Sequence, residues 1–219
     1  KIQLSKKKLA KKSVNFEQNI LKEIVGSQDQ IAAAYGGFNS IKFNKDGSYI
    51  VRPLKLKNKT EENLNKKLLL LYTGKQRRAN DIAKTYVKDL SNNKKKEMRA
   101  IQEFVFKAKV YLKNDSLDDF GDLLNESWYK KKELSKNISS NLIDSIYSKA
   151  LKNGALGGKI LGAGGGGFFL FYVREDKLLN FKRTFSNYPL ISFKFEKKGS
   201  HTIFNSEKNN DWVNSYFAN

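Results

Sequence analysis

The chain has 219 residues, a formal net charge of +20 at pH 7 and no cysteine. Its length allows one sizeable domain or two small ones. The lack of cysteine excludes disulfide bonds and thiolate metal sites and is consistent with a cytoplasmic protein. No apolar run is long enough to span a membrane.

The positive charge comes mainly from lysines spread along the whole chain, as in SKKKLAKK and NNKKKE. Arginine, which recognises bases and phosphates better than lysine, is sparse. Because a run of charge is usually a solvated surface, we predict neither a specific nucleic-acid partner nor a membrane partner. Weak binding to polyanions remains compatible with the charge.

The first third of the chain predicts two helices and a hairpin. Apolar residues between 9 and 25 recur at helical spacing, and Ser5 is a suitable N-cap. The stretch VGSQDQIAAAYGGFN, residues 25–39, predicts a second helix that ends at Gly36-Gly37. Residues 40–56 alternate around Asp46-Gly47, which predicts a β-hairpin. The polar stretch at 60–67 is interpreted as a boundary.

The rest of the chain mixes strands and helices. KLLLLYTG, residues 67–74, predicts a buried strand, and residues 80–151 are mostly helical, with interruptions near 113–115 and 136–137. Another buried strand at 168–173 is followed by a helix over 175–187. A final strand is predicted at 190–199, with 201–206 as a candidate pairing partner. This mixture without βαβ regularity predicts an α+β fold.

The stretch GGKILGAGGGGFFLFYV, residues 157–173, places four consecutive glycines between two apolar segments. Ordered glycines are costly, because each loses more backbone freedom than any other residue. GAGGGG satisfies the GxGxxG spacing, but a strand follows instead of the helix of a dinucleotide site, and the P-loop pattern is absent. Two interpretations remain: a tight hairpin, or a nest of backbone N–H groups that faces an anionic ligand.

Four stretches together indicate a family. Residues 157–172 resemble the C-terminal motif of the GHMP kinases, and residues 25–39 resemble the segment that carries their active-site Asp. LLLLYTGKQRRANDI and LLNESWYKKKELS resemble the branch that contains the heptose 7-phosphate kinases and the fucokinases. The resemblance implies transfer of the ATP γ-phosphate to the anomeric hydroxyl of D-glycero-D-manno-heptose 7-phosphate, in the biosynthesis of nucleotide-activated heptose for surface polysaccharide.

The resemblance also implies a two-domain architecture. Residues 1–64 would complete an N-terminal domain, and residues 65–219 would form a ferredoxin-like C-terminal domain. Family members place a Gly/Ser-rich phosphate loop before these segments, and no such pattern occurs in this sequence. We therefore expect the chain to be the C-terminal portion of a kinase, to transfer phosphate poorly or not at all alone, and to need a separate N-terminal segment as a partner.

Asp29 matches the family residue that accepts a hydrogen bond from the sugar hydroxyl, as base or as electrostatic anchor. From the residues alone, it is equally suited to cap the Ala-rich helix. Glu17, twelve positions earlier, corresponds to a Mg²⁺ ligand of some members, although an exposed helical Glu is an alternative. The implied cofactors are ATP and Mg²⁺.

The remaining candidates are expected to contact substrate or nucleotide. Gln28 and Gln30 flank Asp29 and have side chains that can bind sugar hydroxyls, while Gly36 and Gly37 allow a ligand to approach closely or simply end the helix. Three cations are candidates for the substrate's phosphate, namely Arg77, Arg78 and Lys130. The predicted nucleotide or phosphate loop comprises Gly162, Ala163, Gly164, Gly165, Gly166 and Gly167. We assign Trp128 to the core and no catalytic role to His201.

Two alternatives stay open. A fucokinase or another sugar 1-kinase would leave Arg77 without a phosphate partner. A non-catalytic kinase remnant would use its basic surface to bind a sugar phosphate or a polyanion; the presence of Asp29 argues against it, and the missing phosphate loop argues for it.

Overall fold

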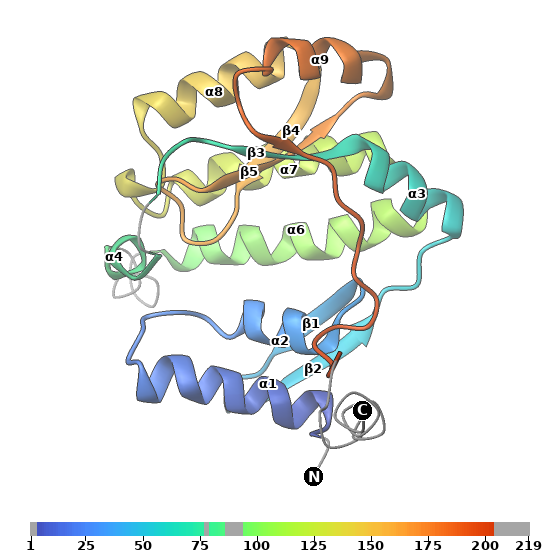
Figure 1. Cartoon of the computed structure of the whole chain (residues 1–219). Coiled ribbons are helices and arrows are strands. Elements are labelled where there is room, and N and C mark those ends of the chain that lie inside the picture. Colours follow the sequence, from blue (N-terminus) through green and yellow to red (C-terminus); the bar gives the residue numbers. More distant parts are fainter. Residues whose placement is uncertain (1–3, 77–78, 86–93, 204–219) are drawn as a thin grey trace, which may run out of the picture.

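The structure is a computed structural model that describes residues 4–76, 79–85 and 94–203. It has a small lobe and a large lobe, and Figure 1 shows the small lobe below the large one. The small lobe consists of α1 (Lys6–Asn15), a π-helical turn (Phe16–Ile20), α2 (Gln28–Tyr35), β1 (Asn39–Phe43) and β2 (Tyr49–Pro53).

The large lobe begins with α3 and contains a four-stranded sheet with helices around it. Its elements in chain order are α3 (Asn58–Lys67), β3 (Leu68–Tyr72), α4 (Ala79–Lys84), α6 (Lys95–Lys113), α7 (Leu117–Lys132), a 3₁₀ turn (Lys136–Ile138), α8 (Asn141–Lys152), β4 (Ala155–Ile160), β5 (Phe168–Val173), a 3₁₀ turn (Glu175–Lys177), α9 (Leu178–Thr184) and β6 (Leu190–Ile191). Among these described residues, no helix is both long and apolar enough to cross a membrane.

Local signals account for the small lobe. The Ser5 side chain accepts a hydrogen bond from the backbone N–H of Lys8 and so caps α1. Gly36 ends α2 with a φ of 62°, a conformation that L-residues rarely adopt. In the turn of the hairpin, Asp46 accepts from the backbone N–H of Ser48 at 2.9 Å. The predicted second helix and the hairpin are confirmed, whereas the first helix ends at Ile20 and does not continue to Val25.

The sheet of the large lobe has the strand order β4-β5-β3-β6, and every neighbouring pair is antiparallel. Helices separate β3 from β4 and β5 from β6, whereas β4 and β5 are joined directly. This is the β-α-β-β-α-β arrangement of ferredoxin-like folds. The predicted α+β class is confirmed.

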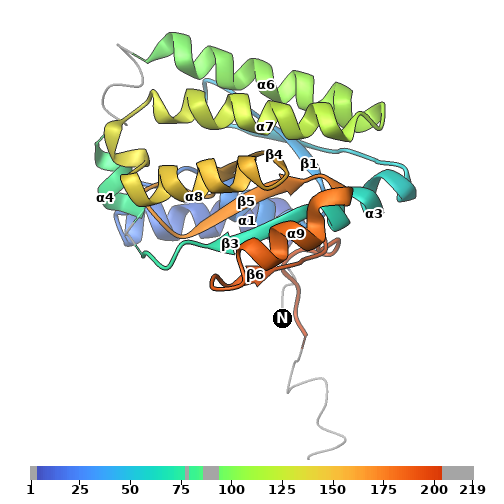
Figure 2. The same ribbon diagram turned by 90° about the horizontal axis from the view of Figure 1, so that it is seen from above.

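The two faces of the sheet bury different side chains. Leu69, Leu71, Phe169 and Phe171 lie on one face and form the main core with residues of α8 and α9. On the other face, Leu68 and Tyr172 pack with side chains from α3, α6 and α7. Figure 2 shows α6 and α7 side by side with nearly parallel axes. Trp128 of α7 is fully buried, so its assignment to the core is confirmed.

The edge strand β4 and helix α7 approach each other very closely. A Cβ added to Gly157 would lie 2.2 Å from the carbonyl oxygen of Gly121 and 2.5 Å from the backbone nitrogen of Asn125. Only glycine allows this backbone contact, which brings the C-terminal half of α7 alongside the end of β4.

Two sequence-based expectations are wrong. Residues 60–67 were expected as a polar boundary, but they belong to α3, because Thr60 and Leu64 lie one turn apart and are both buried. The predicted division between residues 64 and 65 therefore falls inside a helix. The final strand expected at 190–199 pairs with β3 only at Leu190 and Ile191. Residues 201–203 form no strand, and 204–206 lie outside the described residues.

Residues 192–203 instead form a strap that returns from the large lobe to the small lobe (Figure 1). The backbone N–H of Gly37 donates to the carbonyl of Glu196 at 2.6 Å, and that of Ser200 donates to the carbonyl of Ala33 at 2.8 Å. A Cβ on Gly36 would lie 2.1 Å from the backbone nitrogen of Gly199. The strap thus contacts the C-terminal end of α2 backbone to backbone.

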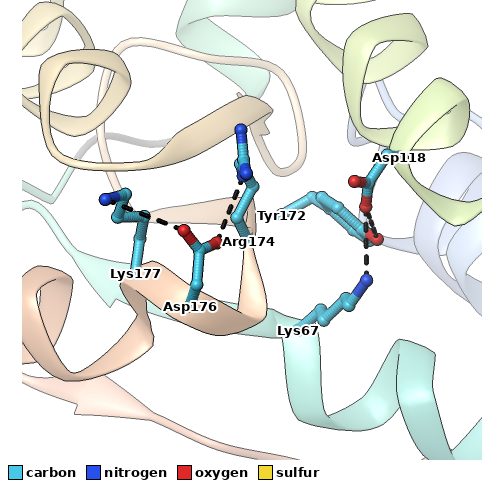
Figure 3. A network of polar contacts seen from close by, with 6 residues as sticks. All are labelled: Lys67, Asp118, Tyr172, Arg174, Asp176 and Lys177. Carbon is cyan, nitrogen blue, oxygen red and sulfur yellow. Dashed lines mark hydrogen bonds and ion pairs between the residues drawn. The ribbon is translucent and has the colours of Figure 1, made fainter.

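A polar network lies at the C-terminal end of β5, the end away from the glycine loop (Figure 3). Asp118 accepts hydrogen bonds from the Tyr172 hydroxyl at 2.7 Å and from Lys67 at 3.2 Å. Asp176 lies 3.2 Å from Arg174 and 3.7 Å from Lys177. Each cation in this network has a carboxylate partner.

Candidate functional site

Asp29 lies in the first turn of α2, the small-lobe helix on the side toward the large lobe (Figure 1). Its side chain is exposed, and it makes no hydrogen bond or ion pair with any residue that the structure describes. The N-cap of α2 is Ser27, so the alternative role of Asp29 as the helix cap is not what the structure shows. With respect to the described residues, its carboxylate is available to a ligand.

Glu17 and Gln30 meet beside Asp29. The Gln30 side-chain amide donates to Glu17 Oε2 at 2.6 Å, and this contact fastens the π-helical turn to the start of α2. Gln30 is buried, and its Oε1 atom has no partner among the described residues. The contact therefore holds the Glu17 carboxylate against Gln30, the residue that follows Asp29 in α2.

These carboxylates fit Mg²⁺ only in part. Mg²⁺ is commonly held by one or two carboxylates, with water and substrate phosphates as its other ligands. Within the described ranges, no group of three or more His, Asp or Glu residues is able to hold a metal ion. Glu17 and Asp29 match the one- or two-carboxylate pattern, and the remaining ligands would have to come from a nucleotide and from water.

The glycine loop between β4 and β5 is anchored by its own backbone. The N–H of Gly165 donates to the carbonyl of Ile138 at 2.9 Å, and the N–H of Gly167 donates to the carbonyl of Lys75 at 2.7 Å. The carbonyl of Gly167 accepts from the Thr73 backbone and hydroxyl, both at 2.9 Å. These N–H groups are occupied, so the loop is buttressed by the segments on either side of it.

Close packing explains why glycines occupy these positions. A Cβ on Gly166 would lie 2.5 Å from the carbonyl oxygen of Lys75, and one on Gly164 would lie 3.0 Å from Ile138. Gly164, Gly165 and Gly167 also have positive φ angles. A loop with side chains at these positions would have to move away from the core.

Lys131 was not predicted as a site residue, yet the structure brings it to the loop. From the last turn of α7, its ammonium donates to the carbonyls of Ile160 at 2.9 Å and Gly162 at 2.6 Å. Burial, and after it the charge of Lys159, lower the pKa of Lys131 to about 7, while the charge of Asp29 opposes this effect. Lys131 thus binds the carbonyls at the glycine loop and is affected by the charge of Asp29, the predicted catalytic carboxylate.

Lys159 completes the cluster from β4. It lies two residues after Gly157, so its side chain lies on the face of the strand that meets α7. Burial lowers its pKa as well. In the part of the chain that the structure describes, neither Lys131 nor Lys159 has a carboxylate within 4.0 Å.

The other predicted residues occupy different environments. Gln28 is exposed, and Gly36 and Gly37 contact the strap, which accounts for this glycine pair without a ligand. Lys130 pairs with Glu133 of the next turn at 2.9 Å. Arg77 and Arg78 lie outside the described residues. Their proposed contacts with substrate stay predictions.

The lysine cluster had a weak signal in the sequence. Lys131 follows the buried Trp128 by three residues, so both lie on the same face of α7. In YKKKEL, however, three successive lysines resemble a solvated surface. The adjacent residue shows how strongly direction matters: Lys132 pairs with Asp144 at 3.0 Å, whereas Lys131 points to the loop.

The geometry defines a class of site. At the start of a helix, a carboxylate with no partner among the described residues acts through its charge on Lys131, which lies with Lys159 beside a glycine loop held by backbone hydrogen bonds. Such a site can accept a proton or a hydrogen bond from a hydroxyl group while it neutralises an anion, which are the requirements of phosphoryl transfer.

Comparisons with known proteins define the same class. Residues 108–188 match the family model "GHMP kinases C terminal". The chain carries a GHMP kinase C-terminal domain, and the resemblance noted in its sequence is confirmed.

Its relatives are sugar kinases. The chain is 34% identical to D-glycero-alpha-D-manno-heptose 7-phosphate kinase of Campylobacter jejuni, over 90% of this chain and 59% of that protein. It is 27% identical to the bifunctional fucokinase/GDP-fucose pyrophosphorylase of Arabidopsis thaliana, over 71% of this chain and 16% of that protein. The crystal structure of a D-glycero-D-manno-heptose 1-phosphate kinase from Bacteroides thetaiotaomicron superposes with a TM-score of 0.70 at 25% identity, over 93% of this chain and 57% of that one. The chain thus spans less than two thirds of its heptose kinase relatives.

Proposed function

We propose that this chain is part of an ATP-dependent sugar kinase that phosphorylates the anomeric hydroxyl of D-glycero-D-manno-heptose 7-phosphate. The reaction would serve the biosynthesis of nucleotide-activated heptose. The similarity to the Campylobacter heptose kinase supports the substrate class. The single observation that carries the proposal is the exposed carboxylate of Asp29, which lies at the residue that the GHMP resemblance assigns to catalysis and acts on Lys131 beside the glycine loop.

In the proposed step, the anomeric oxygen attacks the γ-phosphorus of ATP, and the bond between that phosphorus and the β,γ-bridging oxygen breaks. The hydroxyl proton passes to the carboxylate of Asp29, and ADP leaves with the bridging oxygen. An anomeric hydroxyl is more acidic than an ordinary alcohol, so a carboxylate suffices as its acceptor. Glu17 would hold Mg²⁺, with water and nucleotide oxygens as the other ligands, and the ion supplies charge neutralisation of the phosphates when bound.

A fucokinase is the second candidate, because the Arabidopsis relative, which matches 71% of this chain, is a bifunctional fucokinase. The two candidates differ in one chemical respect: heptose 7-phosphate carries a phosphate of its own, and fucose does not. Two cations that have no carboxylate within 4.0 Å among the described residues favour the phosphorylated sugar.

Calorimetric titration of this chain with the heptose 7-phosphate, with L-fucose and with ATP–Mg²⁺ tests the proposal. We expect the heptose 7-phosphate to bind, fucose to bind more weakly, and ATP to bind poorly because the phosphate loop of the family is not among these residues. The Asp29→Asn variant should bind the sugar roughly tenfold more weakly, since a hydrogen bond to a charged group is lost. Asp119→Asn, an exposed carboxylate on α7, is the matched control.

Each outcome discriminates. Equal binding of fucose and of the heptose 7-phosphate would favour the fucokinase. Tight ATP binding, or ADP formation by this chain alone, would contradict the expectation that the fragment is inactive. Failure of both sugars to bind would overturn the substrate assignment and leave a kinase remnant.

A further inference from the structure

Lys131 and Lys159 have no carboxylate within 4.0 Å among the described residues, in contrast to two other half-buried lysines of the large lobe. Lys67 pairs with Asp118, and Lys132 pairs with Asp144. Lys131 and Lys159 come from α7 and β4 and repel one another. Two cations held together away from water are unfavourable unless something negative joins them.

The surroundings of Lys131 show what could join them. Lys159 faces it from β4, Asp29 faces it from α2, and the carbonyls of Ile160 and Gly162 hold two of its three N–H groups. On α7 itself, Lys130 and Lys132 are paired with other carboxylates and turn elsewhere. As far as the described residues go, one N–H of Lys131 remains for a ligand, and Asp29 is the opposing charge.

We propose that Lys131 and Lys159 form a phosphate-binding site beside Asp29. The bound group is a phosphate dianion. If the chain is part of the proposed kinase, this phosphate belongs either to the sugar 7-phosphate or to the group that ATP transfers; this assignment of the source rests on the proposed function. Ammonium groups bind phosphate through charge-assisted hydrogen bonds. The carbonyls of the glycine loop fix where the Lys131 ammonium lies, so the loop positions the cation.

This assignment gives the glycine loop a different task from the predicted one. The N–H groups of Gly165 and Gly167 are hydrogen-bonded to the carbonyls of Ile138 and Lys75, so they are not donors to an anion. The carbonyls at the start of the loop instead hold Lys131. In the proposed site the anion is bound by the two lysine side chains, and the carbonyls at the loop orient that of Lys131.

Sulfate is the probe, because it remains a dianion from pH 6 to pH 8 and its own charge does not change. Its binding to the whole chain is followed by NMR or calorimetric titration in chloride buffer. Because binding needs Lys131 protonated, and its pKa in the free protein is about 7, we expect sulfate affinity to fall about tenfold from pH 6 to pH 8.

Three variants separate the charge of Lys131 from its structural role. Lys131→Gln should weaken sulfate binding at pH 6 by roughly tenfold or more. Lys131→Arg should bind sulfate equally at both pH values, because arginine stays protonated. Lys159→Gln should weaken binding while the pH dependence remains. Lys113→Gln, an exposed lysine at the end of α6, is the control and should behave as the parent chain.

Competition between ligands identifies the source of the phosphate. If heptose 7-phosphate displaces sulfate and the unphosphorylated heptose does not, the site holds the sugar phosphate; if only ATP displaces it, the site holds the transferred phosphate. Sulfate binding that is lost in Lys131→Gln supports the proposal even where neither sugar binds, an outcome that removes the heptose kinase function alone. Sulfate binding unchanged in Lys131→Gln and Lys159→Gln would overturn the proposal, even where the heptose 7-phosphate binds.

Discussion

The two ends of the β4–β5 pair differ in whether their cations have carboxylate partners. At the end near Arg174, every cation of the network has a carboxylate partner, and the Tyr172 hydroxyl adds a hydrogen bond (Figure 3). At the glycine-loop end, the described partners of Lys131 are backbone carbonyls, and Lys159 and Asp29 act on it through their charges. The first arrangement is complete without a ligand, and the second is not.

This difference separates stability from function. A paired network adds modest stability and binds nothing further. A pair of uncompensated cations costs stability, and it persists where a ligand supplies the missing charge. Substitutions that remove a polar or charged group at the two ends should therefore change stability with opposite signs.

The largest effect on stability is expected from a substitution in the glycine loop itself. In Gly166→Ala, the new methyl would lie 2.5 Å from the Lys75 carbonyl oxygen, so the loop must shift. Overpacking of this kind costs about 1–3 kcal/mol, and each kcal/mol lowers the melting temperature by about 2–4 °C in a domain of this size. Calorimetry measures the change. Gly26→Ala, where a Cβ meets no atom within 4 Å, is the control and should leave the melting temperature nearly unchanged.

Lys131→Met should stabilise the protein. The pKa of Lys131 is about 7 in the folded chain, against an ordinary value of 10.5, so the unfolded chain binds more protons between these values. The contribution of Lys131 to the free energy of unfolding is therefore least favourable below pH 7 and recovers as the pH rises toward 10.5. We expect a gain of about 2–4 °C in melting temperature at pH 6, and a smaller gain at pH 9. A gain that is equal at both pH values, or a loss that is largest at pH 6, would contradict the uncompensated charge.

Tyr172→Phe tests the paired end. The substitution removes the hydrogen bond to Asp118 and should cost about 1 kcal/mol at pH 7. Burial tends to raise the pKa of Asp118, but the Tyr172 and Lys67 hydrogen bonds and nearby cations lower it below 3.8 overall. The stabilisation is thus present above pH 3.8 and is lost as the pH falls through the lowered pKa. The difference between variant and parent in urea unfolding should shrink at pH 3, whereas Asp119→Asn should show no comparable difference at pH 7.

Much of the fold follows from patterns in the sequence. The Asp46-Gly47 turn, the caps at Ser5 and Gly36, and the apolar runs of β3 and β5 each have a local signal that the structure matches. Helix α3 was not predicted, because Thr60 and Leu64 are its only buried residues. Two buried positions are too few to show a helical period in a polar stretch. The strap was predicted to be a strand because its apolar and polar residues alternate. In the structure this alternation instead allows Phe195 to pack on Phe38 of the small lobe.

The site was predictable only where a motif carries it. Asp29 and the loop from Gly162 to Gly167 stand out as sequence motifs. Lys131 does not, because its role depends on which of three adjacent lysines faces β4, and the close approach of α7 at Gly157 decides that. A helix register is a property of tertiary packing, and neither composition nor charge specifies it.

Asp176→Asn should have the smallest effect and is therefore a sharp test of the comparison. Asp176 lies between Arg174 and Lys177, but all three side chains are more than half exposed, so water and salt screen the pairs. We expect a loss of less than about 0.5 kcal/mol in urea unfolding. A larger loss that disappears at high salt would show that this network stabilises the end of β5 through its charges. In that case the paired end contributes to stability beyond the Tyr172 hydrogen bond, and the contrast with Lys131 becomes stronger.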